Sequence, residues 1–151
     1  MKLKKELKIK EFRNNWEKLL LNFQLTDIKI NTHLRESFKK FGITYQQYNV
    51  LRVISASKKG IVSNNYIKER MVQKDADISR LIVRLVSQGF VQKTPKKTDR
   101  RQSEVSLTEK GIELLASIEK EIHIVDRFFY ELSKKEAKTL NLILDKIRNN
   151  G

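Results

Sequence analysis

The sequence predicts a mainly α-helical fold with one β-hairpin and with helices at both ends of the chain. Three observations lead to this prediction. The 151 residues include one proline and five glycines, so few positions interrupt regular structure. Apolar residues recur every three or four positions in both terminal parts of the chain, as on one face of a helix. After Gly89 this spacing gives way to two short segments typical of strands.

The N-terminal part contains the longest helical pattern, over residues 12–41, which predicts one long helix or two nearly continuous ones. Gly42 is expected to end it, because glycine readily adopts the left-handed conformation that closes a helix. Thr44 and Gln47 follow as a capping box, in which two side chains satisfy free backbone amides at a new helix start. A further short helix is expected over residues 63–71.

The next predicted helix covers residues 76–88, with Asp75 as its N-cap and Gly89 at its end. Its larger apolar residues share one face, which should be buried. The outward positions combine polar, cationic and small apolar side chains, which are Asp77, Ser79, Arg80, Val83 and Arg84.

The β-hairpin is predicted from residues 90–94 and 103–107, which a polar loop over residues 95–102 separates. The loop is too long for a two-residue turn, so the hairpin should project. Asp99, the one acidic residue between positions 90 and 102, has the spacing to pair with Arg101 and orient that guanidinium. The cations of the hairpin are Lys93, Lys96, Lys97, Arg100 and Arg101.

The C-terminal part predicts two more helices. Thr108 is expected to cap a helix whose apolar stripe extends over residues 112–129. Ser133 and Glu136 form a second capping box that opens the last helix. No repeat or low-complexity linker divides the sequence, so a single domain over residues 1–151 is expected.

The charge balance indicates a polyanionic partner. Thirty-two Lys and Arg residues face 18 Asp and Glu residues, which gives a net charge of +14. Such a surface attracts nucleic acid first and an anionic membrane second. The absence of cysteine excludes disulfides, thiolate catalysis and cysteine-ligated metals. No apolar run approaches the roughly 18 residues of a membrane span, so a cytoplasmic location is expected. No cofactor is expected.

Short helices followed by a hairpin form the plan of a winged helix-turn-helix. In such a unit the last short helix enters the major groove of DNA, and the hairpin reaches the adjacent minor groove. Arginine can donate two hydrogen bonds to guanine, and a narrow minor groove concentrates the negative potential that attracts cations. DNA binding is the favoured interpretation, and a solvent-exposed helix face beside a solvated basic loop is the alternative.

Several segments, in the correct order over about residues 30–148, resemble the MarR (multiple antibiotic resistance regulator) family. Five motifs of this family have counterparts in the sequence. They are Gly-Leu-Val, Asp-Arg-Arg, Leu-Thr-Glu-Lys-Gly, Leu-Thr-x-x-Gln-x-x-Val-Leu and Leu-Ser-x-Glu-Glu. The matching segments are Gly89-Phe90-Val91, Thr98-Asp99-Arg100-Arg101, Val105-Ser106-Leu107-Thr108-Glu109-Lys110-Gly111, Ile43-Thr44-Tyr45-Gln46-Gln47-Tyr48-Asn49-Val50-Leu51 and Leu132-Ser133-Lys134-Lys135-Glu136.

The resemblance implies a homodimeric transcriptional regulator that binds a palindromic operator, usually as a repressor. The dimerisation helices would extend over about residues 7–42 and 109–149. The winged unit would extend over about residues 44–107. By family likeness Arg101, oriented by Asp99, contacts the minor groove, and the helix of residues 76–88 contacts bases. The candidate DNA-binding residues are Ser79, Arg80, Val83, Arg84, Lys96, Lys97, Asp99, Arg100 and Arg101.

The resemblance also implies a cleft for a small aromatic or amphipathic effector between the dimerisation helices and the winged unit. Aromatic side chains of the N-terminal half are candidates for its lining, although such a stripe is more often core than pocket. The candidate effector residues are Trp16, Phe23, His33, Phe41 and Tyr45.

Other functions remain as alternatives. No Ser-His-Asp, metal-helix or phosphate-loop motif accompanies the two histidines, so an enzyme is not expected. His33 and His123 lie on the predicted dimerisation helices, where a metal-sensing pair is conceivable. An architectural DNA-binding protein without sequence preference is a second alternative. A membrane-surface role for the N-terminal helix, through Trp16 and Phe23, is a third.

Overall fold

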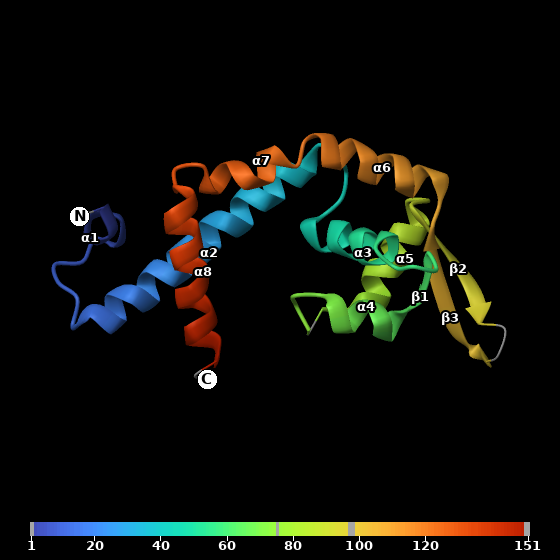
Figure 1. The fold of residues 1–151 in the computed structure, drawn as a ribbon, viewed down its shortest axis with the longest axis horizontal. Coiled ribbons are helices and arrows are strands. Elements are labelled where there is room, and N and C mark those ends of the chain that lie inside the picture. Colours follow the sequence, from blue (N-terminus) through green and yellow to red (C-terminus); the bar gives the residue numbers. More distant parts are fainter. Residues whose placement is uncertain (1, 75, 97–98, 150–151) are drawn as a thin grey trace.

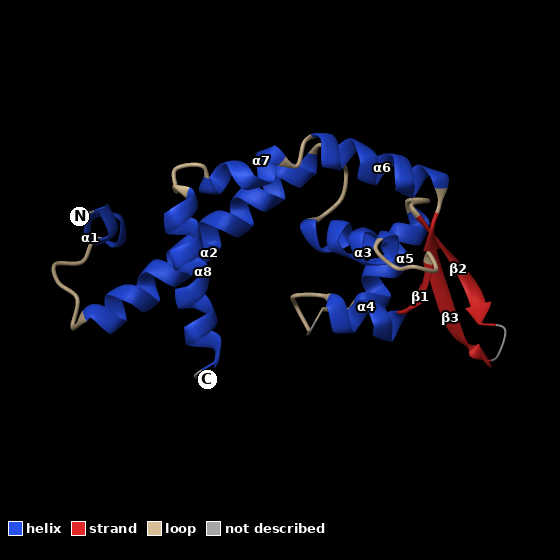
Figure 2. Cartoon of the chain, in the orientation of Figure 1, coloured by secondary structure: helices blue, strands red, loops and turns tan. Residues whose placement is uncertain are grey.

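The computed structural model describes residues 2–74, 76–96 and 99–149 (Figure 1). The chain is mainly α-helical with one small sheet (Figure 2), which confirms the predicted fold class. The elements in chain order are α1 (Lys2–Leu7), α2 (Asn15–Lys39), α3 (Tyr45–Ser55), β1 (Ile61–Ser63), α4 (Asn64–Arg70), α5 (Ile78–Ser87), β2 (Val91–Lys96), β3 (Asp99–Leu107), α6 (Glu109–Lys120), α7 (His123–Asp126), the 3₁₀ helix η1 (Arg127–Phe129) and α8 (Lys134–Asn149).

The elements form two lobes. One lobe, called here the terminal lobe, contains α1, the N-terminal part of α2 and α8 (Figure 1). The other, called the winged lobe, contains α3, α4, α5 and the sheet. Helices α6 and α7 run along one edge of the molecule and join the two lobes. Segments from both ends of the sequence therefore lie together, away from the central segment.

The helical pattern predicted over residues 12–41 forms one continuous helix, α2. Helix α2 begins at Asn15, and the Asn14 side chain caps it by accepting hydrogen bonds from the amides of Trp16 and Glu17. A separate short helix, α1, precedes it. The predicted end is confirmed, because Gly42 follows α2 with a φ of 68°.

The predicted capping box at the start of α3 is confirmed. The Gln47 amide donates to Thr44 Oγ1 at 3.2 Å, and the Thr44 amide donates to Gln47 Oε1 at 2.8 Å. The box fixes the direction in which the chain leaves Gly42. Helix α3 then buries Val50, Leu51 and other apolar side chains against the rest of the winged lobe.

The start of α5 differs from the prediction. Asp77 is the N-cap, and its side chain accepts a hydrogen bond from the Arg80 amide at 3.0 Å. The predicted cap, Asp75, lies outside the described residues. Asp77 therefore belongs to the cap of α5 and not to its outward face, and the helix begins two residues later than expected.

The sheet has three strands in the order β1-β3-β2, all antiparallel. The sequence predicts only the hairpin and misses β1, in which Val62 pairs with Val105 and both side chains are buried. The hairpin strands also extend beyond the predicted limits, to Lys96 and Asp99. Most of the predicted loop over residues 95–102 is therefore strand.

The C-terminal stripe forms two helices and a 3₁₀ turn where the sequence predicts one helix. Helix α6 is capped by Thr108 as predicted, but it ends at Lys120, and the chain turns before α7. The Ser133 capping box is present, because the Glu136 carboxylate accepts from the Ser133 amide and hydroxyl. These hydrogen bonds to Ser133 lower the pKa of Glu136.

The core lies in the winged lobe and receives one side chain from α2. Phe38, near the end of α2, is buried. The centre of its ring lies 4.8 Å from the centre of the Tyr48 ring and 5.4 Å from the centre of the Tyr45 ring. Burial raises the pKa of the Tyr48 hydroxyl above its usual value. The aromatic group thus joins the end of α2 to α3 by packing.

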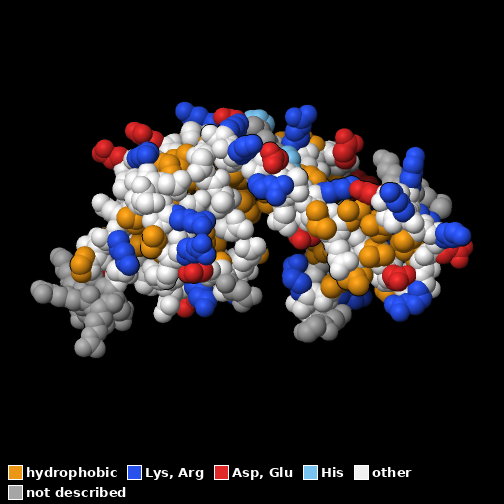
Figure 3. All heavy atoms as spheres, turned by 180° about the vertical axis from the view of Figure 1, so that it is seen from behind, with side chains coloured by type: hydrophobic (Ala, Val, Ile, Leu, Met, Phe, Trp, Pro, Cys, Tyr) orange, Lys and Arg blue, Asp and Glu red, His pale blue; other side chains and the backbone are white. Residues whose placement is uncertain are grey.

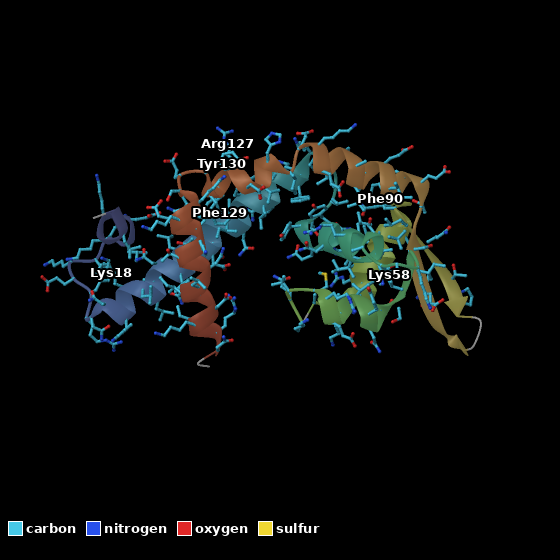
Figure 4. The ribbon with its side chains drawn as sticks, viewed as in Figure 1. Lys18, Lys58, Phe90, Arg127, Phe129 and Tyr130 are labelled. Atoms are coloured by element: carbon cyan, nitrogen blue, oxygen red, sulfur yellow. The ribbon has the colours of Figure 1, made fainter. Side chains whose placement is uncertain are left out.

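Helix α6 approaches the start of β2 at Gly111. A methyl group on Gly111 would lie 2.1 Å from the carbonyl oxygen of Phe90. The same oxygen accepts a hydrogen bond from the Thr108 amide at 3.1 Å. Figure 4 shows Phe90 beneath α6. Glycine is required here by close backbone approach and not by its backbone torsion angles.

We expect Gly111→Ala to lower the free energy of unfolding by about 1–3 kcal/mol, because the added methyl group forces α6 away from Phe90. Urea denaturation measures the change. Glu113→Ala, an exposed substitution on the same helix, is the control and should stay within about 0.5 kcal/mol of the wild type. Equal stability of the Gly111 variant and the control would contradict the close contact.

Candidate nucleic-acid interface

Helix α5 has a buried face and an exposed face, as the sequence predicts. Ile78, Ile82 and Leu85 are buried in the core of the winged lobe. This burial directs the other side of the helix toward solvent. The structure brings four predicted site residues together as exposed side chains on that side, and they are Ser79, Arg80, Val83 and Arg84.

The first turn of α5 is held at two points. The Asp77 side chain satisfies the Arg80 amide. In addition, Asn64 at the start of α4 donates from Nδ2 to Ser79 Oγ over 3.4 Å. Sequence reasoning does not find Asn64, because nothing in the local pattern indicates that the starts of α4 and α5 meet. The contact connects the two helices at the exposed end of the site.

The cations of α5 are not neutralised within the described part of the chain. Neither Arg80 nor Arg84 is in any ion pair there, although Lys29, Arg35, Lys40, Arg70 and Arg148 are. Unpaired guanidinium groups on an exposed helix face can donate to phosphate or to base edges without first breaking an ion pair.

The hairpin carries the second group of predicted site residues. Lys96 is the last residue of β2 and faces Asp99, the first residue of β3, across the ladder. Arg100 and Arg101 follow on β3. Lys97 lies outside the described residues. The hairpin projects from the winged lobe beyond β1 (Figure 1), so its distal end bears these residues.

The C-terminal end of α5 is joined to α3 and to the turn before it. Gln88 Nε2 donates to the carbonyl of Gly42 at 2.9 Å, and Gln88 Oε1 accepts from Gln47 Nε2 at 2.9 Å. Gly89 ends the helix with a φ of 77°. The sequence predicts the roles of Gly42, Gln47 and Gly89 at helix ends, but it gives no indication that Gln88 connects them.

A cleft of about 1020 Å³ lies between α2, α3, the turn before α5, and the α7–η1 segment. Two predicted effector residues line it, His33 and Tyr45. The His33 ring also packs against the Phe128 ring, with 5.7 Å between the ring centres. The other three predicted residues lie outside its lining: Phe41 packs near Phe38, and Trp16 and Phe23 are exposed along α2.

The terminal lobe has an extended exposed apolar surface. Trp16 is 77% exposed, and Figure 3 shows hydrophobic side chains gathered over this lobe, on the right in that view. Exposed apolar area of this extent is unusual for a monomer and typical of an interface. The exposed apolar residues of α2 and α8 are Trp16, Leu19, Leu20, Phe23, Ile28, Leu140, Leu142, Ile143 and Ile147.

Two kinds of feature are absent from the described residues. No three His, Cys, Asp or Glu side chains of residues 2–74, 76–96 and 99–149 are grouped so as to hold a metal ion. None of the helices in these ranges is long and apolar enough to cross a membrane.

The helix-turn-helix, the three-stranded sheet and the projecting hairpin define a winged helix-turn-helix protein. A family model described as the transcriptional regulator SarA/Rot matches residues 33–118. This match covers more than half of the chain, and the chain belongs to the SarA/Rot family of transcriptional regulators. The resemblance to MarR-type winged-helix regulators in the sequence is thereby confirmed.

Individual proteins support this assignment. The chain is 25% identical over 129 residues to the HTH-type transcriptional regulator SarZ of Staphylococcus epidermidis, covering 85% of this chain and 84% of SarZ. It is 29% identical over 84 residues to the HTH-type transcriptional regulator PapX of Escherichia coli, covering 56% of this chain but only 51% of PapX. The fold matches a crystal structure of an E. coli MarR mutant complexed with operator DNA, with a TM-score of 0.77, 23% identity and coverage of 91% and 99% of the two chains.

We expect Asp77→Ala to lower the free energy of unfolding by about 1 kcal/mol, because the Arg80 amide loses its acceptor. Asp77→Asn keeps a capping oxygen and should stay within a few tenths of a kcal/mol of the wild type. Thermal and urea denaturation of both variants measure the difference. Identical stability of the two variants would show that Asp77 does not cap α5.

Proposed function

We propose that the chain binds double-stranded DNA in a sequence-specific manner as a homodimer and represses transcription by occluding promoters. One observation carries the proposal: the exposed face of α5 presents Arg80 and Arg84, which form no ion pair with another described residue, beside Ser79 and Val83. Each of these side chains suits a different feature of the major groove. Such a regulator would act in the cytoplasm.

The proposed docking has α5 in the major groove and the hairpin in the adjacent minor groove. Arg80 and Arg84 would donate to guanine or phosphate, Ser79 to a base edge, and Val83 would contact a thymine methyl. Arg101 would enter the minor groove with Asp99 as its orienting partner, and Lys96, Lys97 and Arg100 would contact phosphates. The MarR mutant with the matching fold is itself bound to operator DNA, which supports this arrangement.

The proposed dimer uses the terminal lobe. The exposed apolar residues of α2 and α8 are too numerous for the winged lobe to cover, and a second copy offers the same surface in return. A twofold dimer presents two winged lobes, so the operator should be a palindrome. The dimerisation segments would be about residues 7–42 and 109–149, and the winged unit about residues 44–107.

A small-molecule effector is a further part of the proposal. The cleft beside His33 and Tyr45 lies where α2 meets the winged lobe, so an occupant would touch both. Its volume of about 1020 Å³ is at the upper end of the range typical of ligand sites. A ligand that binds this cleft in only one orientation of the lobes would change DNA affinity.

Sequence-specific regulation is favoured over architectural DNA binding for one reason. Architectural binding needs only cations and dimer geometry, whereas α5 combines cations with a hydroxyl and an exposed valine. The test is selection from a random DNA library. Enrichment of a palindrome that binds about 10³-fold or more above random DNA supports the regulator, and equal affinity for all sequences contradicts it.

The wing and the recognition helix should respond differently to arginine removal. Arg101→Ala should weaken binding to the selected operator and to random DNA alike, with a salt slope lower by about one. Asp99→Ala should weaken binding to both DNAs in the same way, but less than Arg101→Ala does. Arg80→Ala should cost about 1–3 kcal/mol on the operator and less on random DNA. Fluorescence anisotropy at several salt concentrations measures these changes.

Lys18→Ala is the matched control, because it removes a cation from the terminal lobe (Figure 4). Its affinity should remain within about twofold of the wild type, since a lone charge far from DNA is screened. Unchanged binding by the Arg101 variant would show that the hairpin does not contact DNA.

Light scattering should give a mass of about twice the 17.8 kDa of one chain. Leu20→Lys combined with Ile143→Lys places charges on the exposed apolar surface of the terminal lobe and should produce monomers. Val72→Lys is the control, since Val72 is exposed on the winged lobe and should leave the dimer intact. A monomeric wild type at micromolar concentration would contradict the proposed assembly.

A further inference from the structure

We propose that Gln88 is a positioning residue that fixes the angle of α5 relative to the dimerisation helices and thereby sets the operator spacing that the dimer accepts. The inference rests on the proposed function, because spacing has meaning only for a dimer on two half-sites. It assigns a role to a residue that contacts neither DNA nor effector in that proposal.

The side chain of Gln88 uses both ends of its amide. Its Nε2 donates to the Gly42 carbonyl at 2.9 Å, and its Oε1 accepts from Gln47 Nε2 at 2.9 Å. Gly42 is the residue at which the chain passes from α2 to α3. The Gln88 side chain therefore bonds the end of the proposed recognition helix to the turn that joins α2 to α3.

Gln47 makes this connection rigid. Its side chain is 4% exposed, and its Oε1 already accepts from the Thr44 amide at 2.8 Å. If Gln88 turned away, Gln47 Nε2 would be left buried without an acceptor, which is costly in a protein interior. The Gln47 amide thus holds Gln88 in one position, and Gln88 holds Gly42.

The main chain of Gln88 is joined to the C-terminal dimerisation segment. Lys110 Nζ donates to the Gln88 carbonyl at 2.8 Å and lies 4.8 Å from the centre of the Phe90 ring. Thr108 Oγ1 donates to the Gly89 carbonyl at 2.6 Å. Both donors belong to the start of α6, which continues toward α7 and α8.

Gln88 therefore bonds to segments that lead to both halves of the terminal lobe. The side chain leads to α2 and the carbonyl leads to α6, while residue 88 itself is the C-cap of α5. A rotation of α5 relative to the α2–α3 turn or to the start of α6 must stretch or break at least one of these bonds. The effector cleft lies beside the same connection, because Thr44 lines the cleft and its amide bonds to Gln47.

The test compares operators whose half-site spacing differs. Inserting or deleting one base pair rotates one half-site by about a tenth of a turn. Rigid wild-type dimers should lose about tenfold or more in affinity on either altered operator. Gln88→Met keeps the side-chain length but removes both hydrogen bonds. This variant should lose less than about threefold on the altered operators, while its affinity for a single half-site stays within about twofold of the wild type.

Gln46→Met is the matched control. It makes the same substitution at the position before Gln47 and removes one long hydrogen bond, to Gln73 at 3.4 Å. It should keep the wild-type spacing preference. Loss of the preference in both variants would assign the effect to general destabilisation and overturn the proposal, as would a Gln88 variant that keeps the wild-type preference.

If the Gln88→Met variant does not fold, two further measurements test the proposal. Gln88→Glu keeps an acceptor for Gln47 but places a carboxylate oxygen against the Gly42 carbonyl, so it should relax the spacing preference in the same way. In the wild-type protein, the Gln88 side-chain amide protons should exchange slowly by NMR, and exchange at the solvent rate would overturn the proposal. A wild type without any sequence preference would instead contradict the proposed function.

Discussion

The tight passage from α5 to β2 and α6 is the constraint on which the rest of the structure depends. Gly89 turns the chain out of the helix, and the Phe90 carbonyl lies so close to Gly111 that no side chain fits between them. This contact fixes where the hairpin leaves the core and where α6 begins. Because α6 then leads to the terminal lobe, the directions of α5, the hairpin and α6 are all set within a few residues.

The exposed chemistry follows from what this packing buries. Ile78, Ile82 and Leu85 commit one face of α5 to the core, so Arg80 and Arg84 on the other face are available to a partner. The net charge of +14 alone does not distinguish a DNA-binding surface from a generally basic one. The position of the cations adds to this, because α5 and the β2–β3 hairpin of the same lobe bear Arg80, Arg84, Arg100 and Arg101. The terminal lobe instead exposes apolar surface, which suits a second protein chain.

Local patterns in the sequence predicted the elements whose causes are local. The Thr44–Gln47 box, the helix ends at Gly42 and Gly89, and the exposed face of α5 each depend on residues only a few positions apart. Strand β1 was missed because its stability comes from pairing Val62 with Val105, far away in sequence. The Gln88 contacts were missed for the same reason, since Gly42 lies 46 positions earlier. Asp75 and Asp77 are both suitable caps by type, and the choice depends on where the buried face of α5 begins.

The central claim is that the exposed face of α5 lies against DNA, and the absence of cysteine allows one direct measurement. Val83→Cys and Ile112→Cys each introduce a single thiol, at positions where the native side chains are 62% and 56% exposed on α5 and α6. Alkylation rates are measured with and without the selected operator. The account predicts that operator DNA protects the thiol at position 83 and leaves the thiol at position 112 as reactive as in the free protein. Equal reactivity at position 83 with and without saturating operator would contradict it.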